Sequence, residues 1–93
     1  MVSKPIFISY ATDDTAVAEQ IRERLESSGI PCWVAPRDIA PGEDYAEQII
    51  AAIEGCAVLL LVLSKSSNHS QYVRKEVERA VAKRKVVIPF RIH

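Results

Sequence analysis

The chain has 93 residues, is 48% hydrophobic and carries a formal net charge of zero. This length and apolar content suit one small domain, residues 1–93, and exclude a disordered chain. Zero net charge provides no overall field for nucleic acid or an anionic membrane, and no apolar run approaches the roughly 20 residues that span a bilayer. Because residues 1–5 hold no apolar segment suited to secretion, we expect a cytoplasmic protein.

Four segments have the composition of β-strands. Ile6–Tyr10 and Ile30–Val34 are short and rich in β-formers, and Val86–Phe90 is a similar segment near the end of the chain. Val58–Leu63 is an unbroken apolar run, which is typical of a strand covered on both faces. The sequence therefore predicts four strands.

Three segments with apolar residues at helical spacing separate these strands. Asp13, Asp14 or Thr15 is expected to cap the first helix, which ends at Gly29. The second helix ends at Gly55, and Ser70 is the predicted N-cap of the third. The apolar positions are Val17, Ala18, Ile21 and Leu25, then Ala46, Ile49, Ile50 and Ile53, and finally Val73, Val77, Ala80 and Val81.

Alternation of strands and helices predicts an α/β fold with a parallel sheet and helices on both faces. We favour the flavodoxin-like strand order 2-1-3-4, in which ligands bind at the switch point between strands 1 and 3. That order places the segments Ser9–Asp14 and Ser64–Ser70 on opposite lips of one crevice, at the carboxyl ends of the strands.

Glu76 is the candidate functional residue of the third helix. At about 100° per residue it falls at the margin of the buried face, with Tyr72 one turn earlier on the same edge. A carboxylate there is neither freely solvated nor fully buried, which suits ligand binding. The alternative is an ordinary boundary glutamate paired with Arg79 or Lys75.

Several other kinds of site find little support. The sequence has no GxGxxG or GxxxxGK[ST] motif, and no nucleophile elbow supports a triad of Ser64, His69 and Asp13. The pair Asp13-Asp14 is similar to that of receiver domains, but no aspartate follows the third strand. Lys83–Lys85 suits a helix C-terminus better than a nucleic-acid patch.

The cysteines and histidines do not form a metal motif. Cys32 and Cys56, with His69 and His93, lack zinc spacing, and no CxxC is present. Both cysteines stand beside apolar residues, so we expect two buried thiols, with a disulfide or redox pair as the alternative.

Separate motifs, in the same order along the whole chain, resemble those of TIR (Toll/interleukin-1 receptor) domains, most closely bacterial ones. They are FISYATDD at 7–14, GIPCWVAPRDIAPGEDY at 29–45, VLS at 62–64 and SxxSxYVxxE at 67–76. The segment RDxxPG at 37–42 is similar to the BB loop of that family. The resemblance implies a flavodoxin-like fold, here without the usual fifth strand and last helix.

The resemblance also implies a function. Many family members cleave NAD+ at the nicotinamide–ribose bond, as effectors of innate immunity, antiviral defence or cell death; others are signalling scaffolds that assemble through TIR–TIR contacts. The family's catalytic glutamate corresponds to Glu76, and Tyr72 replaces a usual tryptophan. The residues implied to bind NAD+ are Ser9, Tyr10, Ala11, Trp33, Ser64 and Tyr72, and those implied in BB-loop assembly are Arg37, Asp38, Ile39, Pro41 and Gly42.

One carboxylate is sufficient for this chemistry. Glycoside hydrolysis usually takes two carboxylates, one of them as an acid on the leaving group. Nicotinamide departs from a pyridinium as a neutral molecule and needs no acid, so a single glutamate can stabilise the oxocarbenium-like ribose. NAD+ is then a substrate, with no cofactor or metal expected, and ADP-ribose and a cyclic product are both open.

Because the fifth strand and last helix of the family are missing, we expect the strand at 86–90 to be an edge strand with poorly covered apolar residues. We expect the chain to be a piece of a longer protein or a trimmed one, and a fused or separate sensor domain to be its partner. Acidic residues near the second helix and basic residues on the third favour head-to-tail self-association, with solvated helix faces as the alternative. These are Glu43, Asp44, Glu47 and Glu54, and Arg74, Lys75, Arg79 and Lys83.

Overall fold

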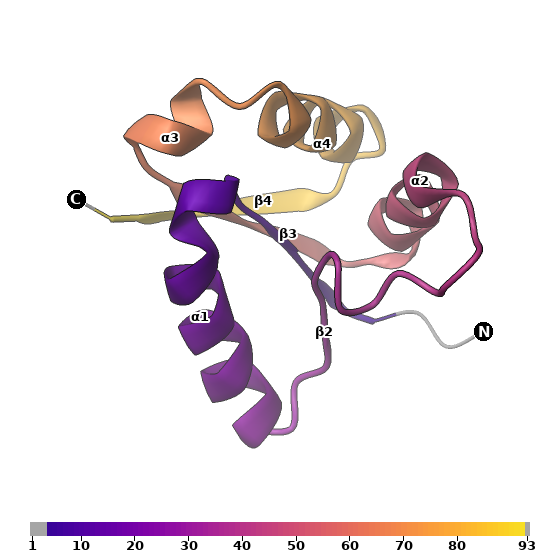
Figure 1. Cartoon of the computed structure of the whole chain (residues 1–93), viewed down its shortest axis with the longest axis horizontal. Coiled ribbons are helices and arrows are strands. Elements are labelled where there is room, and N and C mark those ends of the chain that lie inside the picture. The colour runs from indigo at the N-terminus through magenta and orange to yellow at the C-terminus, as the bar shows by residue number, and fades with distance from the viewer. Residues whose placement is uncertain (1–3, 93) are drawn as a thin grey trace.

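The computed structural model describes residues 4–92 and contains a four-stranded parallel sheet. The strands are β1 (Ile6–Ser9), β2 (Cys32–Trp33), β3 (Val58–Leu63) and β4 (Val86–Arg91). Their order in the sheet is β2-β1-β3-β4, which confirms the predicted 2-1-3-4 arrangement (Figure 1). The second strand is shorter than expected, because only two of its residues pair with β1.

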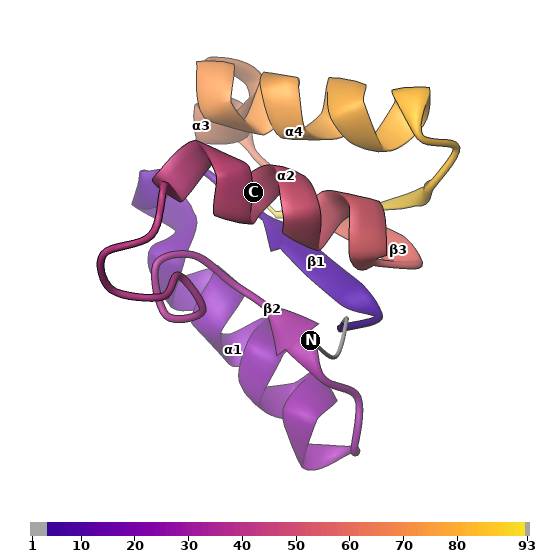
Figure 2. The same ribbon diagram turned by 90° about the vertical axis from the view of Figure 1, so that its right-hand side faces the viewer.

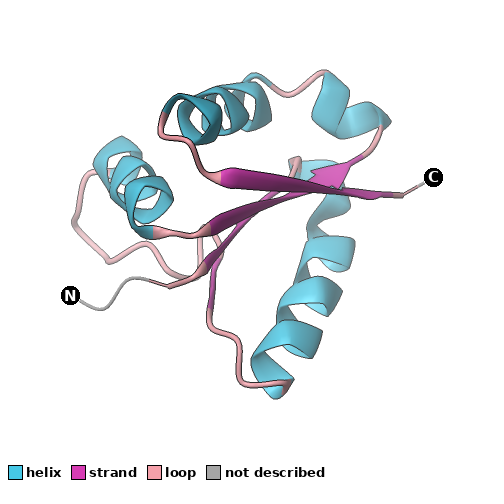
Figure 3. Ribbon diagram, turned by 180° about the vertical axis from the view of Figure 1, so that it is seen from behind, coloured by secondary structure: helices cyan, strands magenta, loops and turns pink. Residues whose placement is uncertain are grey.

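Helices cover both faces of the sheet. Helix α1 (Thr15–Ser27) lies on one face, and helices α2 (Tyr45–Gly55) and α4 (Gln71–Ala82) lie side by side on the other (Figures 2 and 3). Gly29 has a φ of 85°, so it takes the left-handed conformation predicted for the end of the first helix. The arrangement is the flavodoxin-like one that the order of elements predicts.

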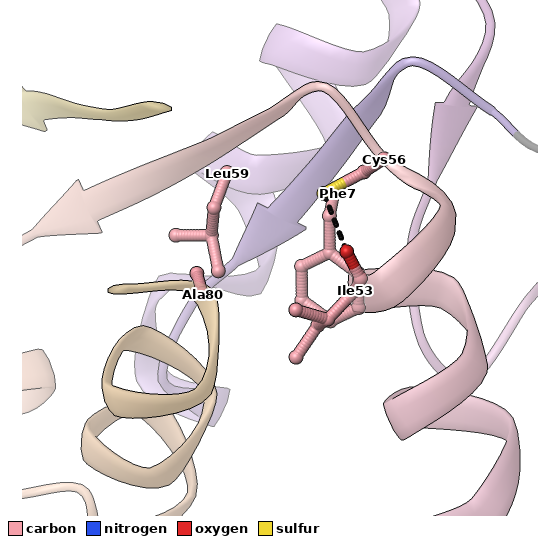
Figure 4. Packing of buried hydrophobic residues seen from close by; sticks show 5 residues of the cluster. All are labelled: Phe7, Ile53, Cys56, Leu59 and Ala80. Carbon is pink, nitrogen blue, oxygen red and sulfur yellow. Dashed lines mark hydrogen bonds between the residues drawn. The ribbon is translucent and has the colours of Figure 1, made fainter. Parts of the chain in front are cut away.

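The two faces of the sheet have separate cores. Phe7 of β1 and Leu59 of β3 pack against Ile53 of α2 and Ala80 of α4, where the Cys56 thiol donates to the Ile53 carbonyl at 3.1 Å (Figure 4). On the other face the alternate side chains of the same strands pack against α1; the buried members are Ile8, Ala18, Cys32, Val34 and Val62. Both cysteines are buried and free, as predicted.

The polar segments that follow β1 and β3 are more ordered than expected. A 3-10 helix, η1 (Thr12–Asp14), follows β1, and a short helix, α3 (Lys65–Asn68), occupies part of the predicted loop 64–70. Ser66 donates to Asp13 at 3.1 Å, and the Ser64 hydroxyl donates to Asp14. Asp14, one of the three predicted candidates, stands at the N-cap of α1, but its side chain makes no capping hydrogen bond. The carboxylates of Asp13 and Asp14 join η1 to α3 instead.

Strand β4 is an edge strand with incomplete cover. Val86, Ile88 and Phe90 pair with Val58, Leu60 and Val62 of β3, and therefore lie on the α1 face of the sheet. These three side chains are 58%, 47% and 47% exposed, which confirms the expected weakness of cover at this edge.

Two valine-to-threonine substitutions test these layers. We expect Val62→Thr to cost about 1–3 kcal/mol of unfolding free energy, because it places a hydroxyl in a fully buried site. Val86→Thr, on the exposed part of the same face, should change the free energy of unfolding by less than about 0.5 kcal/mol. Urea unfolding of both variants makes the comparison, and equal losses would contradict the described layering.

Two further expectations concern the whole chain. Within residues 4–92, no helix is both long enough and apolar enough to span a bilayer. The same residues contain no group of three or more His, Cys, Asp or Glu side chains that could hold a metal ion. His93 lies outside the described residues.

Candidate active site

Glu76 is placed by helix α4. The Ser70 side chain accepts a hydrogen bond from the Val73 amide at 3.2 Å, which fixes the first turn of the helix as predicted. Val73 and Ala80 are buried toward the sheet, so Glu76 and Tyr72, one turn apart, lie along the side of the helix next to α2. Glu76 is half-buried, which matches its predicted position at the margin of the buried face.

A cavity of about 420 Å³ opens in front of Glu76. Its walls come from the end of β1, η1 and the start of α1, the loop after β2, helix α2 and the first turns of α4. The lining residues are Phe7, Ile8, Tyr10, Thr12, Thr15, Ala35, Pro36, Tyr45, Ile49, Ser70, Tyr72 and Glu76. Among the described residues that line the cavity, Glu76 is the only acidic one, and there is no Lys or Arg.

The Glu76 carboxylate has one close partner among the described residues. Ser9, at the end of β1, is fully buried, and its hydroxyl donates to Glu76 Oε1 at 2.8 Å. Burial raises the pKa of Glu76 to about 7, against the opposing effect of the hydrogen bond from Ser9. Neither Lys75 nor Arg79 pairs with it among the described ion pairs, so the alternative of a salt-bridged boundary glutamate is wrong.

Tyrosines frame the cavity. Tyr10 is half-buried and donates to the Ala35 carbonyl at 2.5 Å, which joins β1 to the loop after β2. Tyr45 and Tyr72 are 52% and 79% exposed and stand on α2 and α4. Such exposed rings offer flat apolar surfaces for a planar ligand.

A smaller groove of about 250 Å³ continues from the cavity between α2 and α4. Tyr45, Ile49, Tyr72 and Glu76 line both spaces. Lys75 and Arg79 line the groove but not the cavity, so cationic groups stand beside the site rather than within it.

The structure brings only some of the sequence-predicted site residues together. Tyr10, Tyr72 and Glu76 line the cavity, and Ser9 lies behind Glu76 without lining it. Ala11 is buried and outside the lining. Ser64 caps α3 and contacts Asp14.

Trp33 lies elsewhere. Its ring stacks on Phe7 with the centroids 5.0 Å apart, and it lines a different cavity of about 490 Å³ with Asp38 and Glu43.

The position of the cavity differs from the predicted crevice. The segments after β1 and β3 were expected to form its two lips, but hydrogen bonds between η1 and α3 bring them together. The open space lies instead between η1, the loop after β2, and helices α2 and α4. Sequence reasoning accordingly missed Thr15, Tyr45 and Ile49, whereas Thr12 belongs to the predicted segment 9–14. Tyr45 carried a possible signal, as an aromatic residue at the start of a predicted helix.

The loop after β2 is held by an ion-pair network at its beginning. Arg37 donates to both Glu26 oxygens at 2.8 Å, and Asp38 accepts from the Val34 amide at 2.8 Å and from Lys4 at 3.0 Å. Arg37 and Asp38 are thus engaged within the chain.

The rest of the loop is more accessible. Ile39 is half-buried, whereas residues 40–44, with Pro41 and Gly42, are exposed. Of the residues predicted for assembly, Pro41 and Gly42 lie in the exposed part of the loop, outside this ion-pair network.

This network makes an acid-sensitive contribution to stability. Hydrogen bonds from Arg37 lower the pKa of Glu26 from 4.5 to about 2. A depressed pKa contributes stability that is present above pH 4.5 and is lost as the pH falls toward 2. We expect Glu26→Gln to lose about 1 kcal/mol at pH 7, with the difference from wild type vanishing near pH 2. Thermal unfolding from pH 2 to pH 7 measures it, and a difference independent of pH would contradict the assignment.

Comparison with known proteins identifies the family. A family model described as "TIR domain" matches residues 6–93. The chain belongs to the TIR-domain family. The TIR domain of the Toll-related receptor TRR-2 from Hydra magnipapillata has a TM-score of 0.84 at 28% identity, covering 94% of this chain and 69% of that one. The flavodoxin-like architecture is therefore that of a TIR domain.

Two curated relatives are similar in sequence. "Stimulator of interferon genes protein" from Magallana gigas is 38% identical over 76 residues, which is 81% of this TIR domain and 18% of the relative. "Probable 2' cyclic ADP-D-ribose synthase BdTIR" from Brachypodium distachyon is 31% identical over 86 residues, covering 90% of this chain and 38% of the relative. The chain thus spans well under half of either relative. Both come from eukaryotes, and the closer resemblance to bacterial members stays a prediction.

Proposed function

We propose that this TIR domain cleaves NAD+ at the bond between nicotinamide and ribose. The observation that carries the proposal is the half-buried Glu76 carboxylate in a cavity flanked by Tyr10, Tyr45 and Tyr72. The name of the Brachypodium relative, a cyclic ADP-ribose synthase, supports chemistry on the same class of compound. The name of the Magallana gigas relative, a stimulator of interferon genes protein, supports a role in immune signalling.

The chemistry requires one negative charge near the sugar. When the C1′–N1 bond of NAD+ breaks, both electrons of the bond go to the nicotinamide nitrogen and neutralise the pyridinium. The ribose becomes oxocarbenium-like, and an ionised Glu76 stabilises that positive charge and holds the ribose hydroxyls. A water oxygen then bonds to C1′ and loses a proton to give ADP-ribose; attack by another atom of the same substrate gives a cyclic product.

The remaining parts of NAD+ have candidate partners on the same walls. The exposed rings of Tyr45 and Tyr72 suit stacking with a planar base. Since no Lys or Arg is among the described residues that line the main cavity, the pyrophosphate would meet hydroxyls and backbone amides there, including those at the start of α4 near Ser70. Lys75 and Arg79 of the adjoining groove offer additional positive charge.

Self-association is part of the proposal. The exposed part of the loop after β2, residues 40–44, ends in Glu43 and Asp44, and Glu47 is on the adjacent turn of α2, whereas α4 displays Arg74 and Lys75. Contacts between the acidic segment of one molecule and the basic side chains of α4 on the next would be head-to-tail and would continue from subunit to subunit. We propose that assembly raises turnover and that a sensor domain triggers it, in the cytoplasm, where two free thiols such as Cys32 and Cys56 persist.

A nicotinamide-release assay tests the function. Wild-type protein is incubated with NAD+ at concentrations from dilute to self-associating, and the products are separated by chromatography with mass detection. We expect nicotinamide with either ADP-ribose or a cyclic isomer, at a rate per subunit that rises with concentration. Full turnover by a strictly monomeric preparation would contradict the assembly requirement.

The same assay decides between enzyme and scaffold. A non-catalytic signalling module is the second candidate, favoured by the exposed segment 40–44 and by the absence of Lys and Arg from the described cavity lining. No nicotinamide at any protein concentration, from protein that is folded and associates with itself, would overturn the proposed activity in favour of the scaffold.

A further inference from the structure

Ser9 is a polar residue where the surrounding pattern is apolar. It ends β1 directly after Phe7 and Ile8, opposite Leu61 of β3 in the sheet, and it is 0% exposed. A buried hydroxyl is costly unless it has a partner. The partner of its hydroxyl is Glu76 Oε1, at 2.8 Å, across a sequence separation of 67 residues.

The hydrogen bond leaves the two oxygens of Glu76 in different situations. Oε1 accepts from Ser9 on the side of the sheet. Among the described residues, no side-chain nitrogen or oxygen is both buried and without a partner, so Oε2 is not sealed inside the protein. Since Glu76 lines the cavity, Oε2 is the oxygen available there to a ligand.

We propose that Ser9 is a positioning residue for Glu76. The Ser9 hydroxyl holds Oε1 of the ionised carboxylate, so that Oε2 faces the cavity. This inference rests on the proposed function and assigns Ser9 no contact with substrate. It replaces the direct NAD+-binding role that the resemblance implied for this residue, because the fully buried Ser9 does not line the cavity.

The surroundings of Glu76 offer no substitute for this donor. Tyr10 of β1, Tyr45 of α2 and Tyr72 of α4 line the same cavity, and Lys75 and Arg79 line the adjoining groove. Among the described residues, none of these five side chains hydrogen-bonds to the carboxylate; Ser9 alone does. A donated hydrogen bond stabilises the ionised carboxylate against the effect of burial. Without it, Glu76 should hold its proton to higher pH.

Two substitutions and two readouts test the proposal. In Ser9→Ala the midpoint of Glu76 ionisation, followed by carbon NMR of the glutamate side chains, should move by roughly one pH unit toward alkaline pH. The pH profile of kcat/KM for nicotinamide release should move by the same amount, so that kcat/KM is about fivefold lower at pH 7 and almost fully recovered at pH 9. Ser9→Cys keeps the size and a weak donor, so it should show a smaller movement.

A matched control separates positioning from packing. Ser67 is also buried, and its hydroxyl donates to the Ser64 carbonyl outside the cavity. Ser67→Ala should lower stability without moving the ionisation of Glu76. An unchanged Glu76 midpoint in both Ser9 variants would overturn the proposal. The NMR titration needs no turnover, so it decides the role of Ser9 even if wild-type protein releases no nicotinamide. Absence of nicotinamide release would count against the proposed activity and not against the role of Ser9.

Discussion

Glu76→Gln is expected to lower nicotinamide release from NAD+ at least a hundredfold. Glutamine keeps the size of the side chain and an oxygen that can accept from Ser9 at the position of Oε1. What it removes is the negative charge that stabilises the oxocarbenium-like ribose, and loss of one such electrostatic group costs about 10²–10³ in rate. The measurement is kcat for both proteins at pH 8, where the wild-type carboxylate is ionised.

Glu78→Gln is the matched control for this substitution. Glu78 lies on the same helix but is exposed and outside the main cavity, so its replacement removes the same charge without touching the site. We expect wild-type activity from Glu78→Gln, with circular dichroism showing that both variants are folded. Retention of more than about a tenth of the rate by Glu76→Gln would contradict the assigned role.

The same Glu76→Gln protein is expected to be more stable than wild type above pH 7. The pKa of Glu76 rises from 4.5 to about 7 on folding because the carboxyl group is buried. Between these values the folded state holds a proton that the unfolded state has lost, so wild-type stability falls as the pH rises through this window. Above pH 7 the ionised carboxylate carries the full penalty, about 3 kcal/mol at most, and the neutral glutamine avoids it.

Urea unfolding of wild type and Glu76→Gln at pH 4 and pH 8 measures this difference. The two proteins should have similar free energies of unfolding at pH 4, and the variant should be the more stable at pH 8. Glu78→Gln again provides the comparison. A variant that is less stable than wild type at pH 8 would show that the carboxylate is not under the burial penalty described for it.

The architecture could be predicted from the sequence because its signals are local and periodic. The apolar run at 58–63 and the helical spacing of apolar residues predicted the elements that form the two cores. Counting about 100° per residue along α4 was sufficient to place Glu76 at the margin of the buried face beside Tyr72. These inferences need only the direction in which a side chain leaves its own helix or strand.

The composition of the cavity depends on contacts between distant segments, which the sequence pattern does not specify. Ser9 was expected to face a ligand, and the strand pattern could not reveal that α4 brings Glu76 to within 2.8 Å of it. Trp33 was placed in the pocket, but the short strand β2 directs its ring onto Phe7. Tyr45 was missed because its role depends on how α2 packs beside α4.

The pH dependence of nicotinamide release by wild-type protein tests the central claim most directly, since it joins the burial of Glu76 to the chemistry. If the ionised, half-buried carboxylate carries the reaction, kcat/KM, which reports the pKa of the free enzyme, should rise with pH through an inflection near 7 and level off above it. A rate that is flat from pH 5 to pH 9, or an inflection at the ordinary glutamate value near 4.5, would contradict the assignment of Glu76 as the group that stabilises the ribose cation.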